Sequence, residues 1–192
     1  MEFCRKQISQ NKKGFTLTEL MIIIVIISIM TSVSLVMFNK NRSQKEVETG
    51  ARLVSSTISQ AYSNAITGKM YNVGGSDKNS CWYGVRSVDG SLGMRSFVSY
   101  ISPVNTSCSQ LGNPIVENTT DIQSVKSDFF EISFSLPFGK SNFNGVELIG
   151  PAKIRVYSAR DNSVAYAVCV FPSGRVYEKG CTAANCSDVT CN

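Results

Sequence analysis

Residues 12–30 of this 192-residue chain read KKGFTLTELMIIIVIISIM. The apolar run continues to Phe38, and Glu19 is the only charged residue between Phe15 and Phe38. As a helix, residues 15–38 would reach roughly 36 Å, enough to cross the hydrocarbon core of a bilayer. A cleavable secretory signal has a shorter apolar part, of about 7–15 residues. The segment therefore predicts one transmembrane helix, and the preceding basic residues place residues 1–14 in the cytoplasm.

The composition excludes several kinds of function. The chain has no histidine, so His-ligated metal sites and Ser-His-Asp or Cys-His nucleophiles are absent. It has no G-x-S-x-G sequence, and its acidic residues form no recognisable catalytic pair. We therefore expect no enzymatic activity and no cofactor. The net charge is +5, but four basic and one acidic residue lie in the first 14, so bulk charge does not indicate a nucleic-acid partner.

Glu19 needs a partner, because a carboxylate near the centre of a bilayer costs about 2.5–3.5 kcal/mol. The residues Lys12-Lys13-Gly14-Phe15-Thr16-Leu17-Thr18-Glu19, with the apolar run behind them, resemble the class III signal of type IV prepilins and type II secretion pseudopilins. The resemblance implies cleavage between Gly14 and Phe15 by prepilin peptidase and N-methylation of the new Phe15 amine. It also implies that Glu19 meets the Phe15 ammonium group of a neighbouring subunit in the filament.

Elementary electrostatics agrees with this role for Glu19. Cleavage after Gly14 would create a cation at the N-terminus of a helix, where the helix dipole disfavours positive charge. Glu19 of a neighbour, buried in the same apolar environment, would neutralise both groups. Since an unpaired buried charge is costly, the pair would also set the stagger between subunits.

After Phe38 the sequence becomes polar but keeps a helical period. We expect residues 39–67 to continue the membrane helix as an exported amphipathic helix that ends at Gly68. Gly50 would weaken this helix by about 1 kcal/mol. The apolar stripe is expected to pack against an exported β-domain, as it does in pilins. It consists of Val47, Ala51, Val54, Ile58, Ala61, Tyr62, Ala65 and Ile66.

From Cys81 onward, short β-type runs alternate with Gly, Asn, Ser and Pro. In the run 129–136, Phe130, Ile132, Phe134 and Leu136 share one face. We expect loops at 69–80 and 103–127. The fold class predicted is α+β: a pilin fold with a long N-terminal helix on an antiparallel sheet, in which residues 68–192 form the β-rich domain with a Cys-rich tail. The expected strands are 82–88, 94–101, 129–136, 153–157, 164–171 and 175–178.

The block 129–177 resembles the H-type minor pseudopilins and the T- or U-type minor pilins. Some T-type minor pilins bind DNA through a Gly-Arg-x-Arg motif, and Gly174-Arg175-Val176-Tyr177 lacks the second arginine. Arg175 and Lys179 are the candidates for a nucleic-acid contact, with Lys153, Arg155 and Arg160 as neighbours on a basic face. The alternative is that these charges are solvated strand surface.

Cys4 lies in the leader, which leaves six cysteines in the exported part. Export implies that they are oxidised, and six cysteines allow 15 pairings. Zinc sites usually pair cysteines two to four residues apart, whereas the last three here recur every five residues, so we expect no metal site. We predict the disulfides Cys81–Cys108, Cys169–Cys181 and Cys186–Cys191.

Together these features predict a structural subunit, a minor pilin or pseudopilin of a type IV pilus or type II secretion pseudopilus. It would lie in the bacterial inner membrane as a single-pass protein with its C-terminal domain outside, and in an extracellular or periplasmic filament after assembly. The alternative is a filament-tip binding module, an adhesin or a DNA receptor, acting through the loops at 69–80 and 103–127. The expected partners are other pilin or pseudopilin subunits, prepilin peptidase, the inner-membrane assembly platform and, before assembly, membrane lipid; DNA is the partner with least support.

Overall fold

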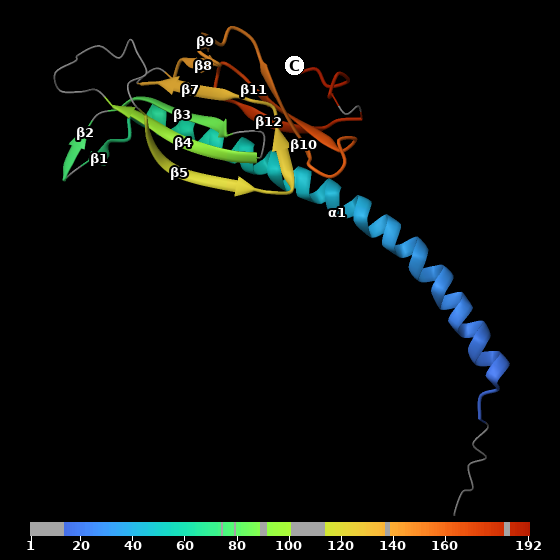
Figure 1. The fold of residues 1–192 in the computed structure, drawn as a ribbon. Coiled ribbons are helices and arrows are strands. Elements are labelled where there is room, and N and C mark those ends of the chain that lie inside the picture. Colours follow the sequence, from blue (N-terminus) through green and yellow to red (C-terminus); the bar gives the residue numbers. More distant parts are fainter. Residues whose placement is uncertain are drawn as a thin grey trace, which may run out of the picture. The chain divides into compact units, whose positions relative to one another are not determined.

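The computed structural model describes residues 14–73, 75–78, 80–88, 92–100, 114–136, 139–182 and 185–192. Side chains are described for the same residues except 33–40, 71–73, 76, 78 and 95–100. One long helix, α1 (Leu17–Thr67), precedes all the strands in this described part (Figure 1). The chain divides into two compact units, 1–40 and 41–192, with the boundary inside α1. Among the described residues, no helix is long and apolar enough to cross a membrane.

α1 ends at Thr67 in a Schellman motif that includes Gly68. The N–H of Gly68 donates to the carbonyl of Ala65 at 3.3 Å, and the N–H of Lys69 donates to the carbonyl of Asn64 at 3.2 Å. Gly68 adopts a φ of 61°, which a residue with a side chain adopts only at a cost. The predicted helix end at Gly68 is therefore confirmed.

The C-terminal half of α1 buries most of the predicted apolar stripe, but Ile66 at its end is 49% exposed. Val47, Val54 and Ile58 are fully buried, and Ala51 and Ala65 are equally inaccessible. Gly50 lies against the strands, because a Cβ added there would be 3.0 Å from Leu92 Cδ2 and 3.1 Å from Val125 Cγ1. The glycine thus permits the close approach of helix and strands. The packing that this approach allows offsets the low helix propensity of glycine.

An antiparallel six-stranded sheet has the order β5-β4-β3-β7-β8-β9. The predicted strands 82–88 and 94–101 are confirmed as the paired strands β3 and β4, and the predicted strand 129–136 as β7. Ile132 and Phe134 of β7 face the core and are fully buried, as their alternation indicates. The strands are β3 (Ser80–Val88), β4 (Leu92–Tyr100), β5 (Ile115–Ile122), β7 (Glu131–Ser135), β8 (Ser141–Phe143) and β9 (Val146–Glu147).

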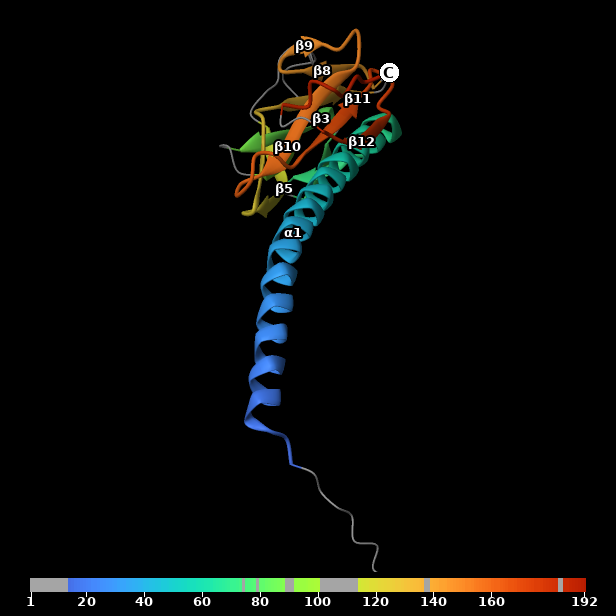
Figure 2. The same ribbon diagram turned by 90° about the vertical axis from the view of Figure 1, so that its right-hand side faces the viewer.

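A second antiparallel sheet has four strands in the order β12-β11-β10-β6. It contains the three predicted strands between 153 and 178. Ile154, Val156 and Val168 from this sheet share one hydrophobic core with Ile132, Phe134 and the α1 stripe. Instead of one sheet, the unit 41–192 thus packs two sheets and the C-terminal half of α1 around a common core (Figure 2). The strands are β6 (Val125–Ser127), β10 (Ala152–Ser158), β11 (Ala165–Val170) and β12 (Val176–Gly180).

The predicted loops are wrong in part. The segment 69–80 contains a small hairpin of β1 (Tyr71–Val73) and β2 (Ser76–Lys78). The segment 103–127 contains β5 and β6, and neither β8 nor β9 was predicted. β5 is an edge strand, exposed on both faces along most of its length, so its sequence IVENTTDI lacks the alternation that marks a half-buried strand.

Two predicted disulfides are also wrong. The structure joins Cys169 to Cys191 and Cys181 to Cys186, with Cα separations of 5.6 and 5.0 Å. Cys169 pairs with Tyr177 in the register, whereas the N–H of Cys181 donates to the carbonyl of Ala165. Cys181 therefore lies opposite Ala165, which is four residues from Cys169 along the same strand. Four strand residues span roughly 13 Å, which is too far for a Cys169–Cys181 bond. Cys81 is disulfide-bonded, and Cys108, its predicted partner, lies outside the described residues.

Candidate assembly site at the start of the helix

The N-terminus of α1 is closed by a capping box. Thr16 precedes the helix, and its hydroxyl oxygen accepts a hydrogen bond from the N–H of Glu19 at 3.3 Å. In return, Glu19 Oε2 accepts from the N–H of Thr16 at 3.4 Å and from its hydroxyl at 3.3 Å. The motif T-x-x-E visible at residues 16–19 signals this arrangement, which the sequence analysis missed.

The capping box fixes the position of the Glu19 carboxylate. It lies in the first turn of α1, where the helix dipole favours negative charge. Only Oε2 is engaged by Thr16; within the described residues, Oε1 accepts no hydrogen bond. One oxygen of the carboxylate is therefore held by its own chain, and the other is accessible to a second donor.

The two residues on either side of the predicted cleavage point precede the helix. Phe15 is 77% exposed, and Gly14 is also exposed. A Cβ added to Gly14 would meet no atom within 4 Å, and its φ is not in the left-handed region. The local fold therefore does not require glycine at position 14, and the bond between Gly14 and Phe15 is accessible.

Behind the capping box, the described part of α1 up to Ser32 is apolar on every side. The large hydrophobic side chains from Leu20 to Met30 are between 44% and 68% exposed in this chain. Three hydroxyls interrupt the run, and each donates to a carbonyl of its own helix: Ser28 to Ile24, Thr31 to Ile27 and Ser32 to Ile29, at 2.8–2.9 Å. These polar groups are satisfied without water, so they do not oppose burial in an apolar environment.

The structure brings two of the candidate basic residues into one row of the second sheet, since Arg155 and Lys179 lie on either side of Ala167. Arg175 precedes β12, and its guanidinium carbon lies 4.2 Å from the ring centroid of Phe171. Lys179 lies near the other end of β12, opposite Ala167. Of their neighbours, Arg155 pairs with Asp128 at 2.8 Å, and Lys153 donates to the carbonyl of Cys186 at 2.8 Å. A nucleic-acid contact at Arg175 and Lys179 therefore stays a prediction.

Comparison with known proteins bears on the N-terminal segment. Residues 9–35 match the prokaryotic N-terminal methylation motif. A search of curated protein sequences finds no significant match. Among solved structures, the type IV minor pilin FimU of Pseudomonas aeruginosa aligns at a TM-score of 0.43 and 9% identity, covering 71% of this chain and 98% of FimU. That structural similarity is low. The chain therefore carries an N-terminal methylation motif at residues 9–35, and this motif is what it shares with known proteins.

Proposed function

We propose that this chain is a structural subunit of a type IV pilus or pseudopilus. It would be made as a precursor, cleaved between Gly14 and Phe15, methylated at the Phe15 amine and added to a filament through α1. The observation that carries the proposal is the run of exposed apolar side chains on α1, with the Glu19 carboxylate held at its start. A helix that is apolar on every side needs an apolar environment, which lipid supplies before assembly and other helices supply afterwards.

We further propose that residues 15–38 insert in the membrane before assembly. The side chains of residues 33–38, the second part of this span, lie outside the described residues, so the argument for it comes from the sequence and from the exposed run up to Ser32. The basic leader would stay in the cytoplasm, where prepilin peptidase would cut it. The two β-sheets would then lie on the outer side of the inner membrane.

The exposed position of Gly14 supports processing at that residue. The structure offers no packing or backbone reason for glycine there, whereas a peptidase that binds the chain closely next to the cleaved bond would require a residue without a side chain. Cleavage would leave the Phe15 ammonium group one residue before Thr16. That cation would face the positive end of its own helix dipole and would therefore favour the carboxylate of a neighbour.

Glu19 is suited to receive that cation. Its Oε2 is held by Thr16, and Oε1 accepts no bond within the described residues. In the filament, Oε1 would accept a charge-assisted hydrogen bond from the Phe15 ammonium group of an adjoining subunit. Pairing would remove two uncompensated charges from an apolar environment, so subunits would add in the register that forms the pair.

Mass spectrometry of the N-terminus tests the processing step. The full-length chain would be produced in cells with and without prepilin peptidase, and the N-terminal peptide would be sequenced. We expect an N-methylated Phe15 terminus with the peptidase and an intact leader without it. A Gly14→Glu variant should retain its leader in both strains, while Gly150→Glu, at a second exposed glycine with open surroundings, should be processed normally. An intact Met1 terminus in the peptidase-positive strain would overturn the proposal.

A further inference from the structure

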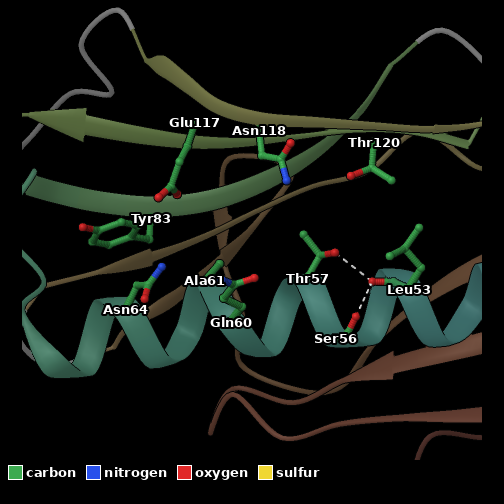
Figure 3. A pocket seen from close by; sticks show the side chains of 10 residues that line it. All are labelled: Leu53, Ser56, Thr57, Gln60, Ala61, Asn64, Tyr83, Glu117, Asn118 and Thr120. Carbon is green, nitrogen blue, oxygen red and sulfur yellow. Dashed lines mark hydrogen bonds between the residues drawn. The ribbon is translucent and has the colours of Figure 1, made fainter.

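A groove opens between the exported half of α1 and the edge strand β5 (Figure 3). Its volume is about 400 Å³, within the usual range of small-molecule sites. β5 contributes only Glu117, Asn118 and Thr120, so the groove is short along the strand. From the helix and from β3 it is lined by Leu53, Ser56, Thr57, Gln60, Ala61, Asn64 and Tyr83.

The rim of the groove consists of amides and hydroxyls. The side-chain amides of Gln60, Asn64 and Asn118 make no hydrogen bond to any described residue, although each amide offers two donors and a carbonyl acceptor. The hydroxyls of Ser56 and Thr57 donate to the carbonyl of Leu53, which leaves their oxygens able to accept. Figure 3 shows Glu117 and Asn118 pointing from β5 toward the helix.

The described residues that line the groove carry almost no unbalanced charge. Their one carboxylate, Glu117, pairs with Lys69 at 3.4 Å. No arginine or lysine is among the described lining residues of the groove. A phosphate-rich or carboxylate-rich ligand would find no cation there, and a cationic ligand would compete with Lys69 for the single carboxylate.

The floor of the groove is less polar than its rim. Ala61 and Tyr83 are buried, and Leu53 is partly buried against the core. The Tyr83 hydroxyl donates to the carbonyl of Lys69 at 2.6 Å, which fixes its ring in place. An apolar floor beneath neutral donors and acceptors matches the surface of a sugar ring, whose C–H groups are apolar and whose hydroxyls both donate and accept.

We infer that this groove is a binding site for a neutral saccharide of about disaccharide size. Gln60, Asn64 and Asn118 would hydrogen-bond the sugar hydroxyls, and the partly buried Leu53 would contact the ring. The short section of β5 favours a compact ligand over an extended peptide strand, which would pair along the whole edge. This activity goes beyond assembly into a filament and does not depend on it.

Nuclear magnetic resonance of the full-length chain tests this inference. The isotope-labelled protein would be held in phosphocholine micelles, because maltoside detergents would themselves offer a saccharide. It would be titrated separately with maltose, cellobiose, lactose and diacetylchitobiose. We expect at least one of them to shift the side-chain amide signals of Gln60, Asn64 and Asn118 in a saturable manner. Glucuronate and spermidine, as anionic and cationic probes, should shift none of them.

Substitutions identify the groove as the place of binding. Gln60→Ala and Asn118→Ala each remove one hydrogen-bonding amide from an exposed side chain, so each should weaken binding about fivefold. Gln44→Ala, at an exposed glutamine of the same helix that does not line the groove, should leave binding unchanged. The inference is overturned if none of the four disaccharides shifts the groove amides. It is equally overturned if Gln44→Ala weakens binding as much as Gln60→Ala, or if only a charged probe binds.

Discussion

Gly174 packs directly against an aromatic ring of the core, so replacing it with alanine should cost stability in two separable ways. Gly174 has a φ of 76°, where a Cβ brings backbone strain of about 1–2 kcal/mol. A Cβ there would also overlap Cγ, Cδ2 and Cε2 of Tyr62. Overpacking of this kind costs about 1–3 kcal/mol, which brings the expected loss to about 2–5 kcal/mol.

The Tyr62 ring has little room to move away. It packs edge-on against Phe134 with centroids 5.3 Å apart. On another side, a Cβ built at Gly139 would lie 3.1 Å from Tyr62 Cε2, so the backbone there is also close. Because the overlap includes Cγ, which lies near the base of the side chain, rotation of the ring about its own axis would not relieve it.

Denaturant unfolding of the full-length chain, followed through the fluorescence of its single tryptophan, would measure the loss. Gly145→Ala is the matched control: it has a φ of 81° but no atom within 4 Å of the added Cβ, so it should cost only about 1–2 kcal/mol. In a Tyr62→Ala background, the additional cost of Gly174→Ala should fall to that of Gly145→Ala. Equal losses for Gly174→Ala and Gly145→Ala with Tyr62 present would refute the reasoning.

The tail and its disulfides provide further predictions. The Cys169–Cys191 bond closes a longer loop than the Cys181–Cys186 bond, with sequence separations of 22 and 5. Replacing the first pair with serines should therefore lower the free energy of unfolding, measured with denaturant, by about 1 kcal/mol more than replacing the second pair. Lys153 donates to the carbonyls of Cys186 and Val189, so Lys153→Met should accelerate hydrogen exchange in residues 185–192, whereas Lys126→Met, at an exposed lysine, should not. Thr16→Ala should raise amide exchange in the first turn of α1, because losing an N-cap costs about 0.5–2 kcal/mol, whereas Thr16→Ser should preserve protection.

The parts of the fold that are encoded locally could be predicted from the sequence. The period of the stripe from Val47 to Ala65 gave the buried face of α1, and Gly68 gave its end, because both depend on residues within a few turns. β7 was predictable because one face is buried and its residues alternate. β5 was not predictable, because neither of its faces is buried along most of the strand. Its pairing with β4 also depends on residues that are distant in the sequence.

The same distinction between local and long-range features applies to the candidate site. Gly14, Phe15 and Glu19 could be proposed from a short motif, and the T-x-x-E signal for the observed capping box was present in the same residues. The disulfides could not be derived, because the register of β11 and β12 decides which cysteines approach each other. The groove beside β5 could not be predicted from the sequence either, since its lining residues come from α1, β3 and β5, which are distant in the sequence.

The most direct test of the central claim is whether Glu19 is required for entry into a filament. Wild-type, Glu19→Ala and Glu48→Ala chains would be compared in sheared filament fractions and in membrane fractions, Glu48 being a carboxylate farther along the same helix that pairs with Arg52. We expect all three chains to be processed and to reach the membrane, while Glu19→Ala alone is missing from the filaments. Recovery of Glu19→Ala in filaments at the wild-type level would contradict this expectation.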